Sequence, residues 1–345
     1  MKKTNFTAFY PSRRYWADSA IDFSDQTKQH WFLNQMKDEV FEGNTGQVTL
    51  KVCRDGRIML RVEALEREFA PNEVEPIEQM VGRWGQYLDH MNAFYLLFDS
   101  AMLELKQYAL FNLHEITHRD AFRVTFENGV WGGENMAMES IASTFQSDRF
   151  AAPGFNAMPN PAALPLEHDP RFSNRYVVDR SVFENAFSRF SVAIDNPGLV
   201  EKLALYAKSL SEYKAGNYET ALVLSWFVIE STLNALWSKH LDSLNRDLPD
   251  RRKRINADRR ATLATGRDYT SSVKSNMLEL WAVLSPELFR DIDTVRGYRN
   301  GVVHDERFQS NAEKTQLALK TAQEMIYERW DFRFTPSLSY SVNGL

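Results

Sequence analysis

Apolar and polar residues alternate in three short stretches of the first half of the chain. Residues 48–52 and 58–62 alternate on either side of Asp55-Gly56, and residues 122–126 alternate before an Asn-Gly pair. Alternation around Asp-Gly predicts an antiparallel β-hairpin, and the third stretch predicts another strand. Between them, residues 77–110 place apolar side chains three and four positions apart, which predicts a helix. The first half is therefore predicted to be α+β with a small antiparallel sheet.

Helical spacing dominates the chain from residue 177 onward. Amphipathic helices are predicted at residues 199–213, 218–241 and 272–284, and a last one at 309–330. Ser285-Pro286 predicts the start of a further helix, because serine caps helix N-termini and proline favours the first helical position. Short connections make neighbouring helices antiparallel. We therefore predict a mainly α protein whose C-terminal part is an antiparallel helical bundle.

Prolines concentrate between these two halves. Five of the twelve lie within residues 150–175, and proline both removes a backbone donor and restricts the residue before it. No long helix or central strand is expected there. We predict four parts: an α+β domain at residues 1–150, a proline-rich linker at 151–176, a helical domain at 177–331 and a tail at 332–345.

The composition is that of a globular protein, with 345 residues, 43% of them hydrophobic and 25% charged. The single cysteine, Cys53, excludes a disulfide framework and a zinc site built from cysteines. The densest apolar run, residues 221–229, is too short to span a membrane and ends at Glu230. No apolar signal segment follows Met1-Lys2-Lys3. We expect a soluble, cytoplasmic protein that does not bind membranes.

The net charge of −5 means that any binding to nucleic acid requires a local basic patch. Residues 251–267 form such a patch, with seven basic residues and one acid, Asp258. These cations favour contacts with RNA phosphates. Two other interpretations stay open: a solvated connector between helices, and a surface that binds an acidic protein. The basic residues are Arg251, Arg252, Lys253, Arg254, Arg259, Arg260 and Arg267.

The segment 288–304 combines an apolar stripe with a charged residue. On a helix, Arg299 lies in the middle of the stripe formed by Leu288, Ile292 and Val295. A guanidinium in that position is costly unless it meets a carboxylate or a phosphate. The carboxylate could be Glu230, which flanks the apolar stripe of the helix predicted at 218–241; the alternative is a phosphate ligand.

Asn300-Gly301 is a helix-stop signal, and His304 lies three residues after this glycine. If the helix continued, His304 would point roughly 140° away from Arg299. The two residues then share a ligand only if the helix ends at Gly301 or if two chains bring their pairs together. A fixed cation beside an imidazole suits phosphodiester cleavage, because arginine can hold the phosphate while histidine moves the proton.

This segment resembles a known family. An Arg-Asn pair separated by three residues from His304, late in a helical bundle and before one more helix, resembles the R-x4–6-H motif of the HEPN superfamily. Residues 213–221, with the helix leading to Glu230, resemble the first long helices of that superfamily. The resemblance covers residues 200–330 and does not extend to the first half of the chain.

The resemblance implies an all-helical domain that forms homodimers in which two motifs face each other. Many members are metal-independent endoribonucleases that use the RNA 2′-hydroxyl as nucleophile and leave a cyclic phosphate. It implies catalytic roles for Arg299, Asn300, His304 and Glu230, RNA as the substrate, and no cofactor or metal. Such proteins are often toxins or antiphage effectors with an antitoxin or sensor partner. Glu306 stands where some toxin members carry a tyrosine that a partner enzyme modifies. The alternative is a non-catalytic module that binds nucleic acid or protein.

Two other stretches of the sequence also match known motifs. Arg83 and His90 also match the arginine-to-histidine spacing, but they lie inside one helical pattern without an asparagine after the arginine, so we interpret the match as chance. His114-Glu115-Ile116-Thr117-His118 matches H-E-x-x-H, whose histidines bind zinc one helical turn apart. A predicted strand begins at Phe122, which leaves little helix to hold such ligands. We interpret this motif as polar residues at a helix end.

Overall fold

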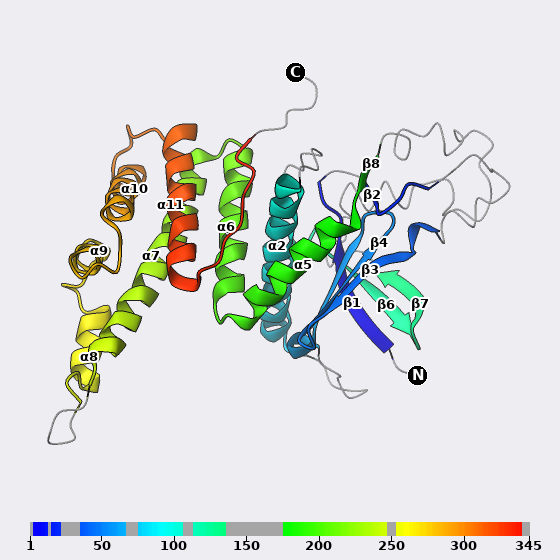
Figure 1. The fold of residues 1–345 in the computed structure, drawn as a ribbon, viewed down its shortest axis with the longest axis horizontal. Helices are drawn as coiled ribbons and strands as arrows, with labels where there is room; N and C mark the ends of the chain where they lie inside the picture. The colour runs from blue at the N-terminus through cyan, green and yellow to red at the C-terminus, as the bar shows by residue number, and fades with distance from the viewer. Residues whose placement is uncertain are drawn as a thin grey trace. The chain divides into compact units, whose positions relative to one another are not determined.

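The computed structural model describes residues 3–12, 15–21, 35–66, 75–105, 113–135, 175–246 and 253–339. Within these residues the chain is mostly helical, with an antiparallel sheet near its N-terminus (Figure 1). It forms two compact units, the first made of Met1–Ala204 with Thr335–Leu345 and the second of Leu205–Phe334. The predicted combination of an α+β region and a later helical region is confirmed.

The first unit is built on a six-stranded sheet in the order β3-β4-β5-β1-β6-β7. The predicted hairpin is β4 (Val48–Cys53) with β5 (Ile58–Val62), joined by a turn in which Gly56 has a φ of 89°. The predicted third strand is β6 (Phe122–Glu127). Its neighbours β1 (Lys3–Phe9) and β7 (Val130–Asn135), and the edge strand β3 (Glu39–Asn44), were not predicted. A separate parallel pair joins β2 (Tyr15–Ala17) to β8 (Tyr176–Val178).

Two helices pack together in this unit. Helix α2 (Ile77–Glu104) is buried on all sides from residue 91 to residue 102, and α5 (Arg180–Asp195) lies along it. Aromatic rings join the two helices: Phe183 stacks on Phe98 with centroids 5.3 Å apart, and Phe190 meets Phe94 edge-on at 5.5 Å. The helix predicted at 77–110 is thus confirmed through residue 104, and residues 106–112 lie outside the described ones.

The division into units differs from the predicted boundaries. We expected the helical domain to begin at residue 177, but the aromatic contacts of α5 place that helix in the first unit, and the second unit begins at Leu205. Nor is 332–345 simply a tail, because the Thr335 N–H donates to Ser100 Oγ at 2.7 Å within the first unit. Most of the predicted linker, residues 151–174, lies outside the described residues.

An ion pair is enclosed inside the first unit. Arg57 is fully buried, and its Nη2 lies 3.1 Å from Oδ2 of Asp55, which is 6% exposed. The guanidinium also donates from Nε to the hydroxyl of Tyr10 at 3.1 Å and lies 4.6 Å from the ring centre of Trp131. Asp55 receives a second hydrogen bond from Tyr10 at 2.8 Å. The Asp55 carboxylate, the Tyr10 hydroxyl and aromatic faces therefore all stabilise the buried charge of Arg57.

The second unit consists of helices. Helix α6 (Leu199–Lys214) begins in the first unit and continues into the second, followed by α7 (Tyr218–Leu244), α8 (Ala257–Thr265), α9 (Ser271–Leu280), α10 (Pro286–His304) and α11 (Ala312–Trp330). The predicted start of α10 is confirmed, because Ser285 Oγ accepts a hydrogen bond from the Leu288 N–H at 3.1 Å and Pro286 follows the cap. The other predicted helices are present, but α9 ends at Leu280 instead of residue 284 and α11 begins at Ala312 instead of residue 309; α8 was not predicted.

Helix α7 is the central element of this unit, packed against α8, α9, α10 and α11 (Figure 1). Among the described helices it alone has the length and apolar composition of a membrane span, with 56% of that window buried. Core helices of soluble proteins show the same combination, because an apolar helix is stable in water only when other elements cover it.

Candidate functional site

Helix α10 does not end at the predicted stop. It continues through Asn300 and Gly301 to His304, so the expectation that Asn300-Gly301 terminates the helix is wrong. The glycine serves close packing instead: a Cβ at Gly301 would overlap the ring of Phe308, which folds back from the connection to α11. A helix can carry glycine in its interior at a modest cost, and here the contact with Phe308 requires it.

The continuous helix separates the two motif residues. With 100° per residue, the five positions from Arg299 to His304 turn the side chains roughly 140° apart. Arg299 is half-buried, whereas His304 is exposed in the last turn. Within one chain, these two side chains therefore do not face a common ligand.

Arg299 lines a cavity of about 510 Å³ inside the second unit. Side chains from α7, α9 and α10, and from the loop before α9, form its wall. Three of the four predicted catalytic residues meet in this cleft, and His304 is not among its lining residues. The charged and amide side chains of the cleft are Glu230, Asn234, Lys274, Arg296, Arg299 and Asn300.

The guanidinium of Arg299 has no carboxylate partner among the described residues. Its Nη1 donates to Oδ1 of Asn300 at 3.2 Å, and its buried Nε has no hydrogen-bond partner. The ion pair considered with Glu230 is not formed, and that carboxylate accepts a hydrogen bond from the Ser271 hydroxyl. A guanidinium with an open donor and no neutralising partner is suited to bind an anion.

Lys274 is a second cation in the cleft, and sequence reasoning missed it. It is only 6% exposed, and its Nζ donates to Oδ1 of Asn234 at 2.7 Å and to the carbonyl of Ala264 at 2.9 Å. Burial lowers the pKa of Lys274, and the nearby Glu230 carboxylate acts in the opposite direction. The sequence could have indicated that Lys274 is buried, because this lysine lies one helical turn before Leu278, on the same face of α9.

With a third cation, Arg296, the described side chains that line the cleft include more cations than carboxylates. Arg296 pairs with Asp293 on the same helix, yet its buried Nε has no partner. The lining therefore holds three cations and one carboxylate, Glu230. Such a cleft attracts anions, and the flat guanidinium of Arg299 matches the geometry of a phosphate.

None of the described residues of the predicted basic patch lines the cleft. Arg251 and Arg252 lie outside the described residues, while Lys253 and Arg254 are exposed before α8. On α8, Arg259 is exposed and Arg260 pairs with Asp242 at 3.0 Å. The patch is linked to the cleft by the end of α8, where the Ala264 carbonyl binds Lys274. RNA contacts by this patch remain a prediction.

The H-E-x-x-H motif is not helical. Residues 113–117 are irregular and residues 118–120 form a turn, so the motif is not a helix end as predicted. The cause is Asn92 of α2, whose side chain binds both the N–H and the carbonyl of Ile116, at 2.7 and 3.0 Å. The histidines are thus not placed one helical turn apart. In the part of the chain that the structure describes, no three His, Cys, Asp or Glu side chains are grouped to hold a metal.

Comparison of this chain with known proteins finds no matching family model, no matching curated protein and no matching solved structure. We therefore infer the function from the residues of the cleft and from their chemistry.

Proposed function

We propose that the second unit is a HEPN-like domain and that the protein is a metal-independent endoribonuclease. The observation that carries the proposal is the meeting of Arg299, Asn300 and Glu230 in one cleft, where the guanidinium has no carboxylate partner among the described residues. In this proposal the protein acts in the cytoplasm as a toxin or antiphage effector, under the control of an antitoxin or a sensor partner.

The reaction needs one group to hold the phosphate and another to move protons. Arg299 would bind the non-bridging oxygens and offset the charge that grows on them, supported by Asn300. The RNA 2′-hydroxyl loses its proton and attacks the adjacent phosphorus, the bond to the 5′-oxygen breaks, and that oxygen gains a proton. The products are a 2′,3′-cyclic phosphate and a free 5′-hydroxyl. His304 would transfer these protons as general acid and base.

His304 can reach this phosphate only from a second chain. Because α10 is continuous, each protomer presents its arginine and its histidine in different directions. A homodimer that pairs two α10 helices about a twofold axis would place His304 of one copy beside the cleft of the other. The proposal therefore requires a dimer formed through the helical unit.

The first experiment is incubation of the purified full-length protein with single-stranded RNA in excess chelator. We expect cleavage that leaves cyclic phosphate ends, detected by mass spectrometry of the fragments. Arg299→Ala should slow this cleavage about 100- to 1,000-fold, because it removes the charge that stabilises the transition state. The matched control is Arg290→Ala on the same helix, whose partner is Glu287 and whose side chain is 71% exposed. Equal rates for both variants would contradict the assigned role of Arg299.

A second prediction concerns Lys274. Replacing it by methionine keeps a long side chain but removes the charge, so affinity for a non-cleavable 2′-O-methyl RNA should fall about tenfold, as expected for one lost charged hydrogen bond. Fluorescence anisotropy measures the affinity, and Lys320→Met on the exposed side of α11 is the control. An affinity equal to that of the control would exclude Lys274 from the RNA site.

A second candidate function is a non-catalytic module that binds nucleic acid or protein in the same cleft. The observation that favours it is the exposure of His304 outside the cleft, which leaves each protomer without a histidine beside Arg299. RNA that binds in a Lys274-dependent manner but is not cleaved by the wild-type dimer would support this alternative over the nuclease.

A further inference from the structure

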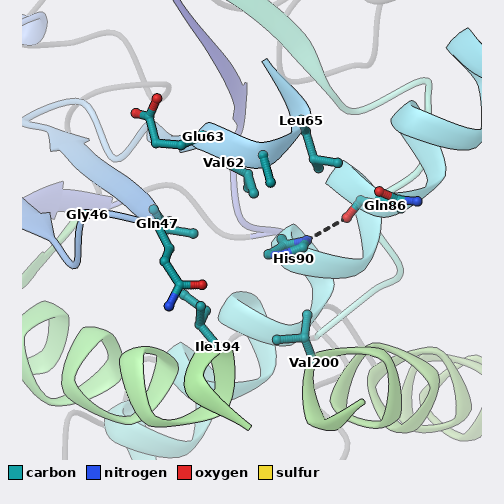
Figure 2. Close-up of a pocket in the computed structure, with 11 residues that line it drawn as sticks. Gly46, Gln47, Val62, Glu63, Leu65, Gln86, His90, Ile194 and Val200 are labelled. Atoms are coloured by element: carbon teal, nitrogen blue, oxygen red, sulfur yellow. Dashed lines mark hydrogen bonds between the residues drawn. The ribbon is translucent and has the colours of Figure 1, made fainter. Parts of the chain in front are cut away.

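The first unit contains a cavity of about 430 Å³ that plays no part in the proposed nuclease. Figure 2 shows it between the β3–β4 turn, the end of β5, helix α2 and the segments around Ile194 and Val200. This volume is within the range of small-molecule sites. Much of the wall is aliphatic, with Val48, Val62, Leu65, Ile194 and Val200 among the lining residues.

His90 is the titratable ring in this wall. Its Nδ1 lies 2.7 Å from the backbone carbonyl of Gln86, and since a carbonyl only accepts, Nδ1 must carry the proton. Burial lowers the pKa of His90, with smaller opposing effects from the Gln86 carbonyl and from Glu201. The ring is therefore neutral near pH 7, and its Nε2 presents a lone pair. No described residue donates a hydrogen bond to that nitrogen, and Figure 2 shows the ring lying between Val62 on one side and Ile194 and Val200 on the other.

The other polar side chains in the cavity wall belong to Gln47, Glu63 and Gln86. Gln47 uses its Nε2 to donate to Oδ1 of Asp195 at 3.0 Å, which leaves its carbonyl oxygen as the free end. Glu63 pairs with Arg61 at 2.8 Å, and Figure 2 shows its carboxylate directed away from His90. Among the residues that the structure describes, no lysine or arginine lines this cavity. An anion would therefore meet no described cation in this cavity, whereas a donor would meet the acceptor Nε2 of His90.

We propose that this cavity binds an uncharged, largely apolar molecule carrying one N–H or O–H group, which donates to Nε2 of His90. Burial against the aliphatic wall supplies the affinity. Because Nδ1 of His90 carries the proton, Nε2 is an acceptor and the ligand must donate the hydrogen bond. This inference stands on the first unit alone and does not depend on the nuclease activity.

The probes that test it are indole, 1-methylindole and indole-3-carboxylate, titrated into the full-length protein and followed by ligand-observed NMR. Indole has the required N–H, and its methylated form has the same rings without a donor. We expect indole to bind at least about tenfold more tightly than 1-methylindole, because the methylated probe leaves His90 Nε2 buried without a partner. Indole-3-carboxylate should bind more weakly than indole, because no described cation in the cavity wall can compensate its charge. Failure of all three probes to bind at about millimolar concentration would overturn the proposal, and so would equal affinity for the first two.

Two variants locate the site. His90→Phe keeps an aromatic ring but removes the acceptor, so the preference for indole over 1-methylindole should disappear. Val200→Trp should fill the cavity and abolish indole binding, while Val192→Trp, on the exposed side of α5 and outside the cavity, should leave it unchanged. Circular dichroism checks that each variant is folded. Indole binding that survives in a folded Val200→Trp variant would show that the probe binds elsewhere.

Discussion

Mixing Arg299→Ala protein with His304→Ala protein should restore RNA cleavage, although each variant alone is nearly inactive. His304→Ala by itself should slow cleavage about 100- to 10,000-fold, the range for loss of a general acid or base. If each site takes its arginine from one copy and its histidine from the other, a mixed dimer retains one intact site of two. Since half of randomly paired dimers are mixed, the recovered rate should be about a quarter of the wild-type rate.

This result would follow from the continuity of α10. A helix that ended at Gly301 could turn His304 toward Arg299 in the same chain, and mixing would then restore nothing, because no chain would carry both residues. The measurement is initial cleavage rate after the two variants are unfolded and refolded together, with separately refolded variants combined afterwards as the control. Light scattering confirms that all samples are dimers. A mixed sample as inactive as its parents would show that the site does not combine residues from two chains in this way.

Asp55→Ala should destabilise the first unit by about 3–5 kcal/mol, the range for removing one partner of a buried ion pair. The guanidinium of Arg57 is fully buried and loses its carboxylate in this variant. Urea unfolding followed by circular dichroism gives the free energy of unfolding. The control is Glu184→Ala on α5, which removes a carboxylate 55% exposed beside Arg180 and should cost less than about 1 kcal/mol.

The double variant Asp55→Leu with Arg57→Met separates the charge from the packing. If the loss in Asp55→Ala comes from an unpaired charge, removing both charges should recover most of the stability, because apolar side chains of similar volume can replace a buried pair. A double variant as unstable as Asp55→Ala would show that these residues act through their shape and their contacts with Tyr10.

Elements specified by neighbouring residues were predictable from the sequence. The β4–β5 hairpin needs a turn and two alternating stretches, and the start of α10 needs only Ser285 and Pro286. Both signals lie within a few residues of the structure that they specify. For the same reason the helices of the second unit lie near their predicted positions, since each repeats its own apolar spacing.

What could not be predicted depends on residues far apart in the sequence. Gly301 has the local pattern of a helix stop, but the ring of Phe308 determines its role. The region around Ile116 has a helical motif, but Asn92 binds its backbone in another conformation. Helix α5 has the spacing of the helices that follow it, but its phenylalanines pack on α2.

The same limit applies to the cleft. Arg299 was recognised because its charge interrupts an apolar stripe, which is a property of its own helix. Lys274 enters the cleft through acceptors supplied by α7 and α8, forty and ten residues away. Its partners are therefore visible only once these helices are packed together.

The order of the two units along the chain has a consequence for any attempt to separate them. The second unit is inserted into the first, since the polypeptide leaves the first unit inside α6 and returns to it at Thr335. A protease that cuts the chain at one of these crossings would release neither unit, because the polypeptide would still connect the two units at the other crossing. Two cuts are needed to release the helical unit. A truncation from either end of the chain would also remove part of the unit that contains the sheet.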